Sequence, residues 1–379
     1  MIEKTIPFAK PNFTDDDINE ITQEIAKVLR SGWLTAGPMV KKFEDEFAKR
    51  IGTKYAVALN SCTAALHATF LALGIKSGDE VIVPSNTFVA TANAALYVGA
   101  KPVFADSEPH TFNVSASDVL KKITSRTKAI TVVHLGGNPC DMNELLEIAD
   151  AKNMFVIEDC AHAHGAKYHE TSCGLIGKAG CFSFYPTKVM TSGEGGMVTT
   201  NDESLAAKIK IIRNVGRAAY GPTAIQELGY NFRISDIHAV IGLAQLVHLD
   251  DFLMHRNNAA KFYNSKLSKI KWLKPQTIRK GNLSSYYAYI VELTNDAPVA
   301  RDELASIMKQ HGIGTSVLYH PVHLQPLYVK LFGFKNGLLP VTERLGEQTI
   351  ALPLDNNISN NEQKRVVETI KQISEEAKS

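Results

Sequence analysis

The stretch SFYPTK at residues 183–188 ends in a lysine that could do chemistry. Lys188 follows an apolar run, and the proline two residues before it fixes the backbone of the connecting turn. A lysine held in a pocket beside other cations loses its proton more readily and can act as an amine nucleophile. Most lysines are surface residues, so this segment alone does not exclude that Lys188 is an ordinary surface lysine.

A second segment places an acid at the end of an apolar run. Residues 154–158 have the pattern of a buried strand, and Asp159 follows directly. A buried carboxylate needs a cation as its partner, and a protonated pyridine nitrogen is one such cation. An ion pair with a distant arginine, or a metal site built from His162 and His164, are the alternatives. We expect no metal, because this HxH pair has no third ligand at a useful spacing.

A third segment, Asn60–Ala64, leads small polar residues into a predicted helix. The N–H groups and hydroxyls at such a helix start can bind a phosphate, although Ser and Thr also occur there simply as helix caps. A phosphate site, an acid after one strand and a lysine after a later strand are the three anchors that pyridoxal 5′-phosphate (PLP) requires.

Short apolar runs alternate with helical patterns between residues 55 and 200, which predicts a doubly wound α/β domain. The runs lack polar alternation, as is typical of a mostly parallel sheet covered on both faces. Amphipathic helices are expected before them, at 14–31 and 39–50. The predicted strands are 55–59, 80–83, 102–105, 129–134, 154–158, 181–184 and 197–200, and the predicted helices between them include 63–73, 90–98, 118–123 and 143–152.

The C-terminal third predicts a smaller α+β unit. A proline-free helical stretch from Ser235 to about Leu267 leads into it, and a strand is expected at 286–293. Further helices are expected at 301–310 and 361–376. We therefore expect a large domain at residues 1–255 and a small C-terminal domain at residues 256–379.

The composition excludes several classes of partner. The 41 Lys and Arg residues nearly balance the 39 Asp and Glu residues, with no basic cluster, so we expect no nucleic-acid binding. The most apolar stretch, residues 88–100, is too short to span a membrane. The five cysteines form no CxxC pair, which favours free thiols in a reducing compartment, and we expect a cytoplasmic protein.

Several ordered motifs carry a resemblance to a known family. GWLTAGP (32–38), VIED (156–159), FSFYPTK (182–188) and GGMVTTND (195–202) occur in the order found there. With them the chain resembles, nearly from end to end, the sugar aminotransferases of the DegT/DnrJ/EryC1/StrS family. The resemblance implies a fold-type I PLP transferase, with a mostly parallel sheet in a large three-layer domain and a smaller C-terminal α+β domain.

The resemblance assigns the central catalytic role to Lys188. Lys188 would form the internal aldimine with PLP and then move the proton during transfer, with pyridoxamine 5′-phosphate (PMP) as the intermediate form of the cofactor. Asp159 would pair with the pyridine nitrogen and keep it protonated. The residues at the phosphate-binding positions are Cys62, Thr63 and Ser183, and Cys62 could contribute only its backbone N–H there.

Two ring-bearing residues complete the cofactor site that the resemblance implies. Phe88 corresponds to the aromatic residue that stacks on the pyridine face, although a core position is an alternative. His162 corresponds to a Gln or His that contacts the cofactor ring or its 3′-oxygen.

The resemblance also implies a homodimer. Asn231 corresponds to an asparagine that reaches the phosphate of the neighbouring subunit's cofactor, so the active sites would be shared. Trp33, His134 and His320 lie where the family lines its sugar pocket, although each of them could instead be an interface or core residue.

The implied reaction moves an amino group from an amino acid, with L-glutamate as the expected donor, to a 3- or 4-keto group of a nucleotide-linked deoxysugar. The product would enter a surface polysaccharide or a glycosylated metabolite. Family members that dehydrate sugars carry histidine in place of the lysine, so Lys188 favours amino transfer over a PLP/PMP-dependent dehydratase. A non-catalytic PLP-binding regulator is the remaining alternative.

Overall fold

A computed structural model describes residues 5–218 and 224–376 of the chain. Its α-helices are α1 (Asp15–Ser31), α2 (Pro38–Ile51), α3 (Cys62–Ala72), α4 (Val89–Tyr97), α5 (Ala116–Lys122), α6 (Met142–Ala151), α7 (Glu203–Arg213), α8 (Asp236–Val247), α9 (Leu249–Leu267), α10 (Arg301–Gln310), α11 (Pro326–Phe332), α12 (Pro340–Gln348) and α13 (Asn360–Glu376). Its strands are β1 (Tyr55–Leu59), β2 (Glu80–Pro84), β3 (Lys101–Ala105), β4 (Thr127–Val133), β5 (Phe155–Asp159), β6 (Lys167–Tyr168), β7 (Thr171–Ser172), β8 (Ala179–Ser183), β9 (Gly196–Thr200), β10 (Leu273–Pro275), β11 (Tyr289–Leu293) and β12 (Thr349–Leu352).

The large sheet confirms the predicted α/β class. Within the described residues it has seven strands in the order β1-β9-β8-β5-β4-β2-β3. The pairs from β8 through β5, β4 and β2 to β3 are all parallel. Strand β9 alone runs antiparallel to both of its neighbours, β1 and β8. The carboxyl ends of β1, β5 and β8 therefore share one edge, which is where ligands bind in such sheets.

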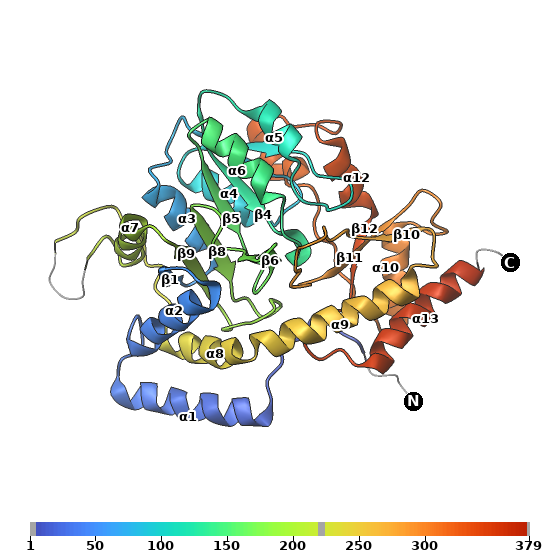
Figure 1. Cartoon of the computed structure of the whole chain (residues 1–379), viewed down its shortest axis with the longest axis horizontal. Helices are drawn as coiled ribbons and strands as arrows, with labels where there is room; N and C mark the ends of the chain where they lie inside the picture. The colour runs from blue at the N-terminus through green and yellow to red at the C-terminus, as the bar shows by residue number, and fades with distance from the viewer. Residues whose placement is uncertain (1–4, 219–223, 377–379) are drawn as a thin grey trace.

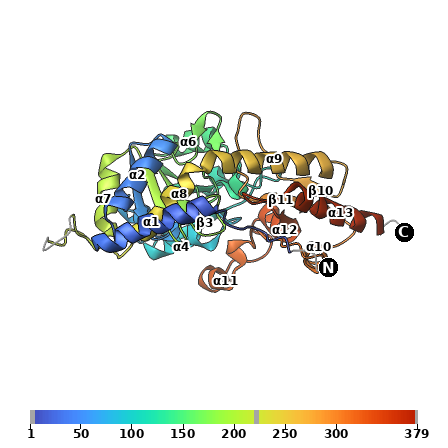
Figure 2. The ribbon, with the colours of Figure 1, turned by 90° about the horizontal axis from the view of Figure 1, so that it is seen from below.

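Both faces of this sheet are covered, which explains why its strands lack polar alternation. In β1, Ala56 and Ala58 pack against α2 and α8, whereas Val57 and Leu59 pack against α3 and α7 on the opposite face. Farther along the sheet, α5 and α6 cover the strands on one face and α4 covers them on the other. Figure 2 shows α2 and α6 on one side of the large domain and α4 on the opposite side.

Helix α1 shows why the predicted helix bounds were accurate where caps are strong. Thr14 accepts a hydrogen bond from the Asp17 N–H (3.1 Å), and the Asp17 side chain accepts one from the Thr14 N–H (2.8 Å). Gly32 ends the helix with a φ of 70°, a left-handed conformation that favours glycine.

The predicted single helix from Ser235 to Leu267 is wrong, because the structure divides it into two. Helix α8 ends at Val247, α9 begins at Leu249, and their axes meet at 57°. The intervening His248 bonds through Nε2 to the Asp17 carboxylate on α1 (2.7 Å), so the bend is in contact with the first helix. In the part of the chain that the structure describes, no single helix is long and apolar enough to cross a membrane, and only this bent pair meets the length and composition together.

The C-terminal residues build a second, smaller core around the antiparallel sheet β10-β11-β12. Helix α9 connects the two cores: Phe252 packs in the core beside the large sheet, and Tyr263 packs in the C-terminal core. Figures 1 and 2 show α9 extending from beneath the large sheet to the C-terminal unit, where it lies beside α13. A division into residues 1–255 and 256–379 falls inside α9, between these two contacts, and we keep this division as a proposal.

Candidate active site

A cavity of about 510 Å³ opens at the carboxyl edge of the large sheet. Its lining comes from the ends of β5 and β8, the start of α3, the segment before α4, and two C-terminal segments around residues 287 and 316–319. Of the residues predicted for the cofactor site, the cavity is lined by Cys62, Thr63, Phe88, Asp159, His162, Ser183 and Lys188.

Lys188 is half-buried in a turn that follows β8. Its N–H donates to the Tyr185 carbonyl (2.9 Å), which closes the turn around Pro186. The ammonium group lies 4.6 Å from the centre of the Tyr287 ring, a cation–π contact that holds the side chain over the cavity. Lys188 is therefore directed into the cavity and is not a surface lysine.

Asp159 ends β5 on the same side of the sheet, and its side chain is buried. It accepts hydrogen bonds from the Thr91 hydroxyl (2.7 Å) and the Ala161 N–H (3.1 Å). Burial raises the pKa of Asp159, while these two hydrogen bonds and the charge of Lys188 act in the opposite direction. The site thus holds a carboxylate that would gain from a cation inside the cavity.

The start of α3 forms the third wall of the cavity. Ser61 caps the helix by accepting from the Ala64 N–H (3.1 Å), and the remaining first-turn N–H groups have no partner inside the helix. These donors and the positive end of the helix dipole suit an anion such as a phosphate. Gly196 lets β9 lie close to this turn, because a Cβ there would stand 2.2 Å from the Ser61 carbonyl oxygen.

The Cys62 side chain has a contact that the sequence did not suggest. Its thiol lies 3.5 Å from the Cys181 carbonyl oxygen and 3.9 Å from an Asp159 carboxylate oxygen. Burial, followed by the charge of Asp159, raises the pKa of the Cys62 thiol well above its usual range. The thiol therefore stays protonated and can donate toward Asp159, in addition to whatever the Cys62 N–H binds.

Phe88 is 56% exposed, which excludes the alternative that it is a core residue. It occupies the N-cap position of α4, and its ring centre lies 6.0 Å from that of Tyr319. An exposed aromatic ring at the rim of a cavity offers an apolar face to a bound planar ring.

His162 is buried between two tyrosines. Its ring is stacked on Tyr287 with centres 4.0 Å apart, and its Nε2 lies 3.0 Å from the Tyr319 hydroxyl. The Gly136 N–H donates to the other nitrogen, Nδ1 (3.3 Å). Burial, reinforced by the charge of Lys188, holds the pKa of His162 well below its usual range, so the ring is neutral.

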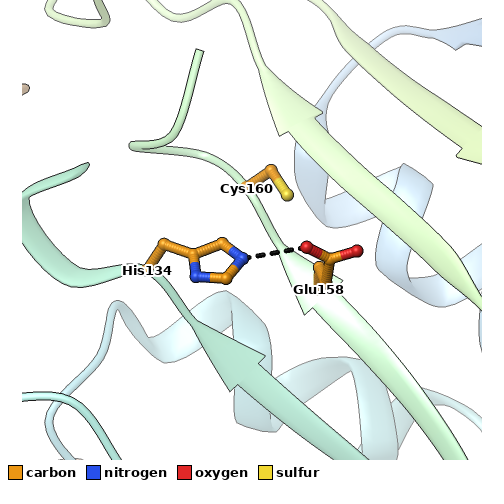
Figure 3. A group of neighbouring side chains, drawn as sticks. All are labelled: His134, Glu158 and Cys160. Atoms are coloured by element: carbon orange, nitrogen blue, oxygen red, sulfur yellow. Dashed lines mark hydrogen bonds and ion pairs between the residues drawn. The ribbon is translucent and has the colours of Figure 1, made fainter. Parts of the chain in front are cut away.

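His134 does not reach the cavity, contrary to its expected place in a sugar pocket. Its side chain is fully buried, its Nε2 lies 3.1 Å from Glu158, and its Nδ1 accepts from the Cys140 N–H (3.0 Å). Figure 3 shows His134 directed at Glu158, with Cys160 beside them. One ring nitrogen of His134, one carboxylate oxygen of Glu158 and the sulfur of Cys160 lie within 4.8 Å of one another, as the ligands of a metal ion could.

Glu158 is already satisfied within this cluster, because its carboxylate also accepts from three backbone N–H groups of residues 174–177 at 2.7–2.9 Å. The arrangement fixes the loop between β5 and β8 to the strands. We therefore interpret His134 as a structural residue that anchors this loop.

Three other predicted residues do not line this cavity. Trp33 is 55% exposed, and His320 is exposed next to the cavity residue Tyr319. Asn231 is exposed and lines a neighbouring polar cavity. The two cavities share Glu194.

Sequence reasoning missed three polar side chains of the site: Thr91, Tyr287 and Tyr319. Thr91 is one of two polar residues, with Asn93, in an otherwise apolar helix pattern, and this was the one local signal available. The two tyrosines come from segments 99 and 131 positions beyond Lys188 and carry no local signal.

Comparisons with known proteins agree with this geometry. The model of the DegT/DnrJ/EryC1/StrS aminotransferase family matches residues 15–371. The spore coat polysaccharide biosynthesis protein SpsC of Bacillus subtilis is 38% identical, with 97% of each chain covered. GDP-perosamine synthase of Escherichia coli O157:H7 is 37% identical, with 98% of this chain and 99% of that protein covered.

A solved structure shares the fold over nearly the whole chain. Spr1654 of Streptococcus pneumoniae in its PLP form superposes with a TM-score of 0.91 at 30% identity, covering 98% of this chain and 99% of that one. The same protein has also been solved in a PMP form. This chain therefore belongs to the DegT/DnrJ/EryC1/StrS aminotransferase family, a family of PLP-dependent enzymes.

Proposed function

We propose that this protein is a PLP-dependent aminotransferase that moves an amino group from L-glutamate to a 3- or 4-keto group of a nucleotide-linked deoxysugar. The observation that carries the proposal is the placement of Lys188, Asp159 and the start of α3 on three sides of one cavity. An amine, a carboxylate and an anion site are three different chemical requirements, and PLP meets all three.

The donor set of the cavity fits this cofactor. Burial raises the pKa of the Asp159 carboxylate, and a protonated pyridine nitrogen would supply a cation that stabilises its charged form. The N–H groups of Cys62 and Thr63, with the Ser183 hydroxyl, would hold the phosphate, and Phe88 would cover one face of the ring.

Bound PLP would supply an aldehyde that takes up the amino group and a pyridine ring that accepts electrons. The chain's own residues would do the rest. Lys188 Nζ is the only lysine nitrogen among the described residues that line the cavity, so it is the group to take a proton and return it. Asp159, held by Thr91 and Ala161, would keep the proton on the pyridine nitrogen.

The sugar acceptor is proposed from the relatives, one of which is named GDP-perosamine synthase. Trp33 and His320 are exposed, and His320 directly follows the cavity residue Tyr319, so both side chains are accessible to a long nucleotide-linked substrate. His134 is left out of this set because its side chain is enclosed by protein atoms.

A spectroscopic experiment tests the proposal directly. The purified protein with added PLP should absorb visible light, and L-glutamate should convert it to the pyridoxamine form with release of 2-oxoglutarate. Borohydride should fix the cofactor to Lys188 in the wild type, whereas Lys188→Ala should bind PLP only non-covalently and lack turnover.

Three outcomes would contradict the proposal. Failure to bind PLP would exclude the cofactor, and an unchanged spectrum with every amino acid would favour a regulator. Loss of water from a keto-sugar substrate without a nitrogen gain would favour a dehydratase.

A further inference from the structure

The hydroxyl of Tyr319 has an orientation that follows from the hydrogen bonds of His162. Tyr319 lines the cavity, its hydroxyl oxygen lies 3.0 Å from His162 Nε2, and its ring stands beside that of Phe88. Which of the two groups donates in this pair is decided by the proton on the imidazole.

The other nitrogen of His162 settles the question. Nδ1 accepts a hydrogen bond from the Gly136 N–H, so it carries a lone pair and no proton. The buried ring is neutral, and its single N–H must then be on Nε2. His162 Nε2–H therefore donates to the Tyr319 oxygen.

As a result, the Tyr319 O–H cannot donate to His162 and stays available. Within residues 5–218 and 224–376, the bond with His162 is the only one made by this hydroxyl. Burial raises the pKa of Tyr319 well above its usual range, so the phenol keeps its proton. The Tyr319 O–H is thus a hydrogen-bond donor in the cavity that can bind an acceptor on a ligand.

The acceptor can be inferred from the ring chemistry of PLP, so this step rests on the proposed function. If Asp159, Lys188 and the start of α3 hold the ring nitrogen, the aldehyde and the phosphate arm, one polar substituent of the ring is left, its phenolic oxygen. That oxygen is next to the aldehyde and on the side away from the phosphate arm.

We propose that Tyr319, held in place by His162, donates its O–H to the phenolic oxygen of bound PLP. His162 itself is then a positioning residue, because both of its nitrogens are engaged by protein groups. This differs from the expectation that residue 162 contacts the 3′-oxygen directly.

A binding experiment with two ligands tests the assignment. In a Lys188→Ala background all binding is non-covalent, and the dissociation constants of PLP and of 3-deoxypyridoxal 5′-phosphate, which lacks the phenolic hydroxyl, are measured by fluorescence. Adding Tyr319→Phe should weaken PLP binding about tenfold and leave the 3-deoxy analogue unchanged, because a hydrogen bond to a charged oxygen is lost only with PLP.

Tyr287→Phe is the matched control, since it removes a hydroxyl from the same cavity that bonds to Thr187 (3.3 Å) and not to His162. It should change the two dissociation constants by the same factor. A spectral titration gives a second readout: without the Tyr319 donor, the phenolic oxygen of bound PLP should titrate at a higher pH.

Equal weakening of both ligands by Tyr319→Phe would mean that the hydroxyl is only structural. Unchanged binding of both ligands would mean that the Tyr319 hydroxyl does not contact the cofactor. Both results would overturn the inference while leaving PLP binding intact, whereas no binding of either ligand in the Lys188→Ala background would instead overturn the proposed function.

Discussion

Asp159 has a charge that burial disfavours. The same charge serves the proposed reaction and lowers the stability of the fold. The carboxylate is 5% exposed and its pKa is raised chiefly by burial. The charge of Lys188 offsets only part of the effect of burial, so the charge of Asp159 costs free energy of folding. Functional sites often contain such locally unfavourable charges.

Asp159→Asn should therefore affect activity and stability in opposite directions. We expect the amino-transfer rate to fall by roughly a hundredfold or more, because a fixed charge that favours the protonated pyridine is lost. The cofactor-free variant should melt at the same temperature or higher, since the cost of burying a charge disappears and Thr91 can still donate to the amide oxygen, which outweighs the loss of an acceptor for the Ala161 N–H. Steady-state kinetics and thermal unfolding check both halves, and near-normal rates would remove the role of Asp159.

His164 predicts a pH dependence of stability. Its ring is fully buried, with the Phe182 and Phe184 ring centres 5.5 Å and 5.6 Å away, and burial lowers its pKa to about 3. Between pH 6.5 and 3 the unfolded chain binds a proton here that the folded chain does not. Stability should thus fall as the pH falls below 6.5, by about 1.4 kcal/mol per pH unit from this group.

The variant His164→Leu isolates this contribution. Its free energy of unfolding, measured by urea titration at several pH values, should depend less steeply on pH below 6.5 than that of the wild type. Equal slopes for the two proteins would show that another group causes the acid sensitivity.

At the scale of elements, the anion site depends on how closely β9 approaches the start of α3. A Cβ on Gly196 would stand 2.2 Å from the Ser61 oxygen and 2.6 Å from the Cys62 nitrogen, and both are backbone atoms that cannot rotate away. The helix start would have to move, and with it the N–H groups proposed to bind the phosphate.

Gly196→Ala should therefore weaken PLP binding at least tenfold and reduce stability by about 1–3 kcal/mol. Gly195→Ala is the matched control, because its Cβ would meet only side-chain atoms, the nearest being the Ser192 hydroxyl at 2.5 Å. We expect a smaller loss there in the melting temperature and in the PLP dissociation constant. Equal losses in both variants would show that the close approach at Gly196 is not critical.

At the scale of the whole molecule, Asn231 raises the question of whether the active sites are shared. Asn231 is exposed and does not line the cavity that contains Lys188 of its own subunit. If it completes the cofactor site of a partner subunit, as we propose, the homodimer is the functional unit.

Heterodimers with two different tags test this arrangement. A dimer of one Lys188→Ala subunit and one Asn231→Asp subunit should have one intact site, and about half the activity of the wild type. The control pairs a wild-type subunit with a subunit carrying both substitutions, which should leave no intact site. Half activity in this control, with none in the first dimer, would show that Asn231 serves its own subunit.

From the sequence alone, the strands of the large sheet, most of the helices around it and the residues at the strand ends could be predicted. Apolar runs without polar alternation predicted the parallel strands, and strong caps such as Thr14 and Gly32 predicted helix bounds. Because parallel strands align their carboxyl ends, Lys188 and Asp159 were expected at one site, and the structure directs both into one cavity. These features depend on local pattern and on simple topology.

Only the tertiary structure decided which way each remaining side chain faces. His134 turns inward to Glu158, while Tyr319 reaches the cavity from a segment 157 positions beyond its partner His162. His248, at the bend between α8 and α9, likewise contacts Asp17 on the first helix. Such contacts join segments that are far apart in the chain, and the local sequence pattern of each segment does not predict them. They are therefore known only from the packed structure.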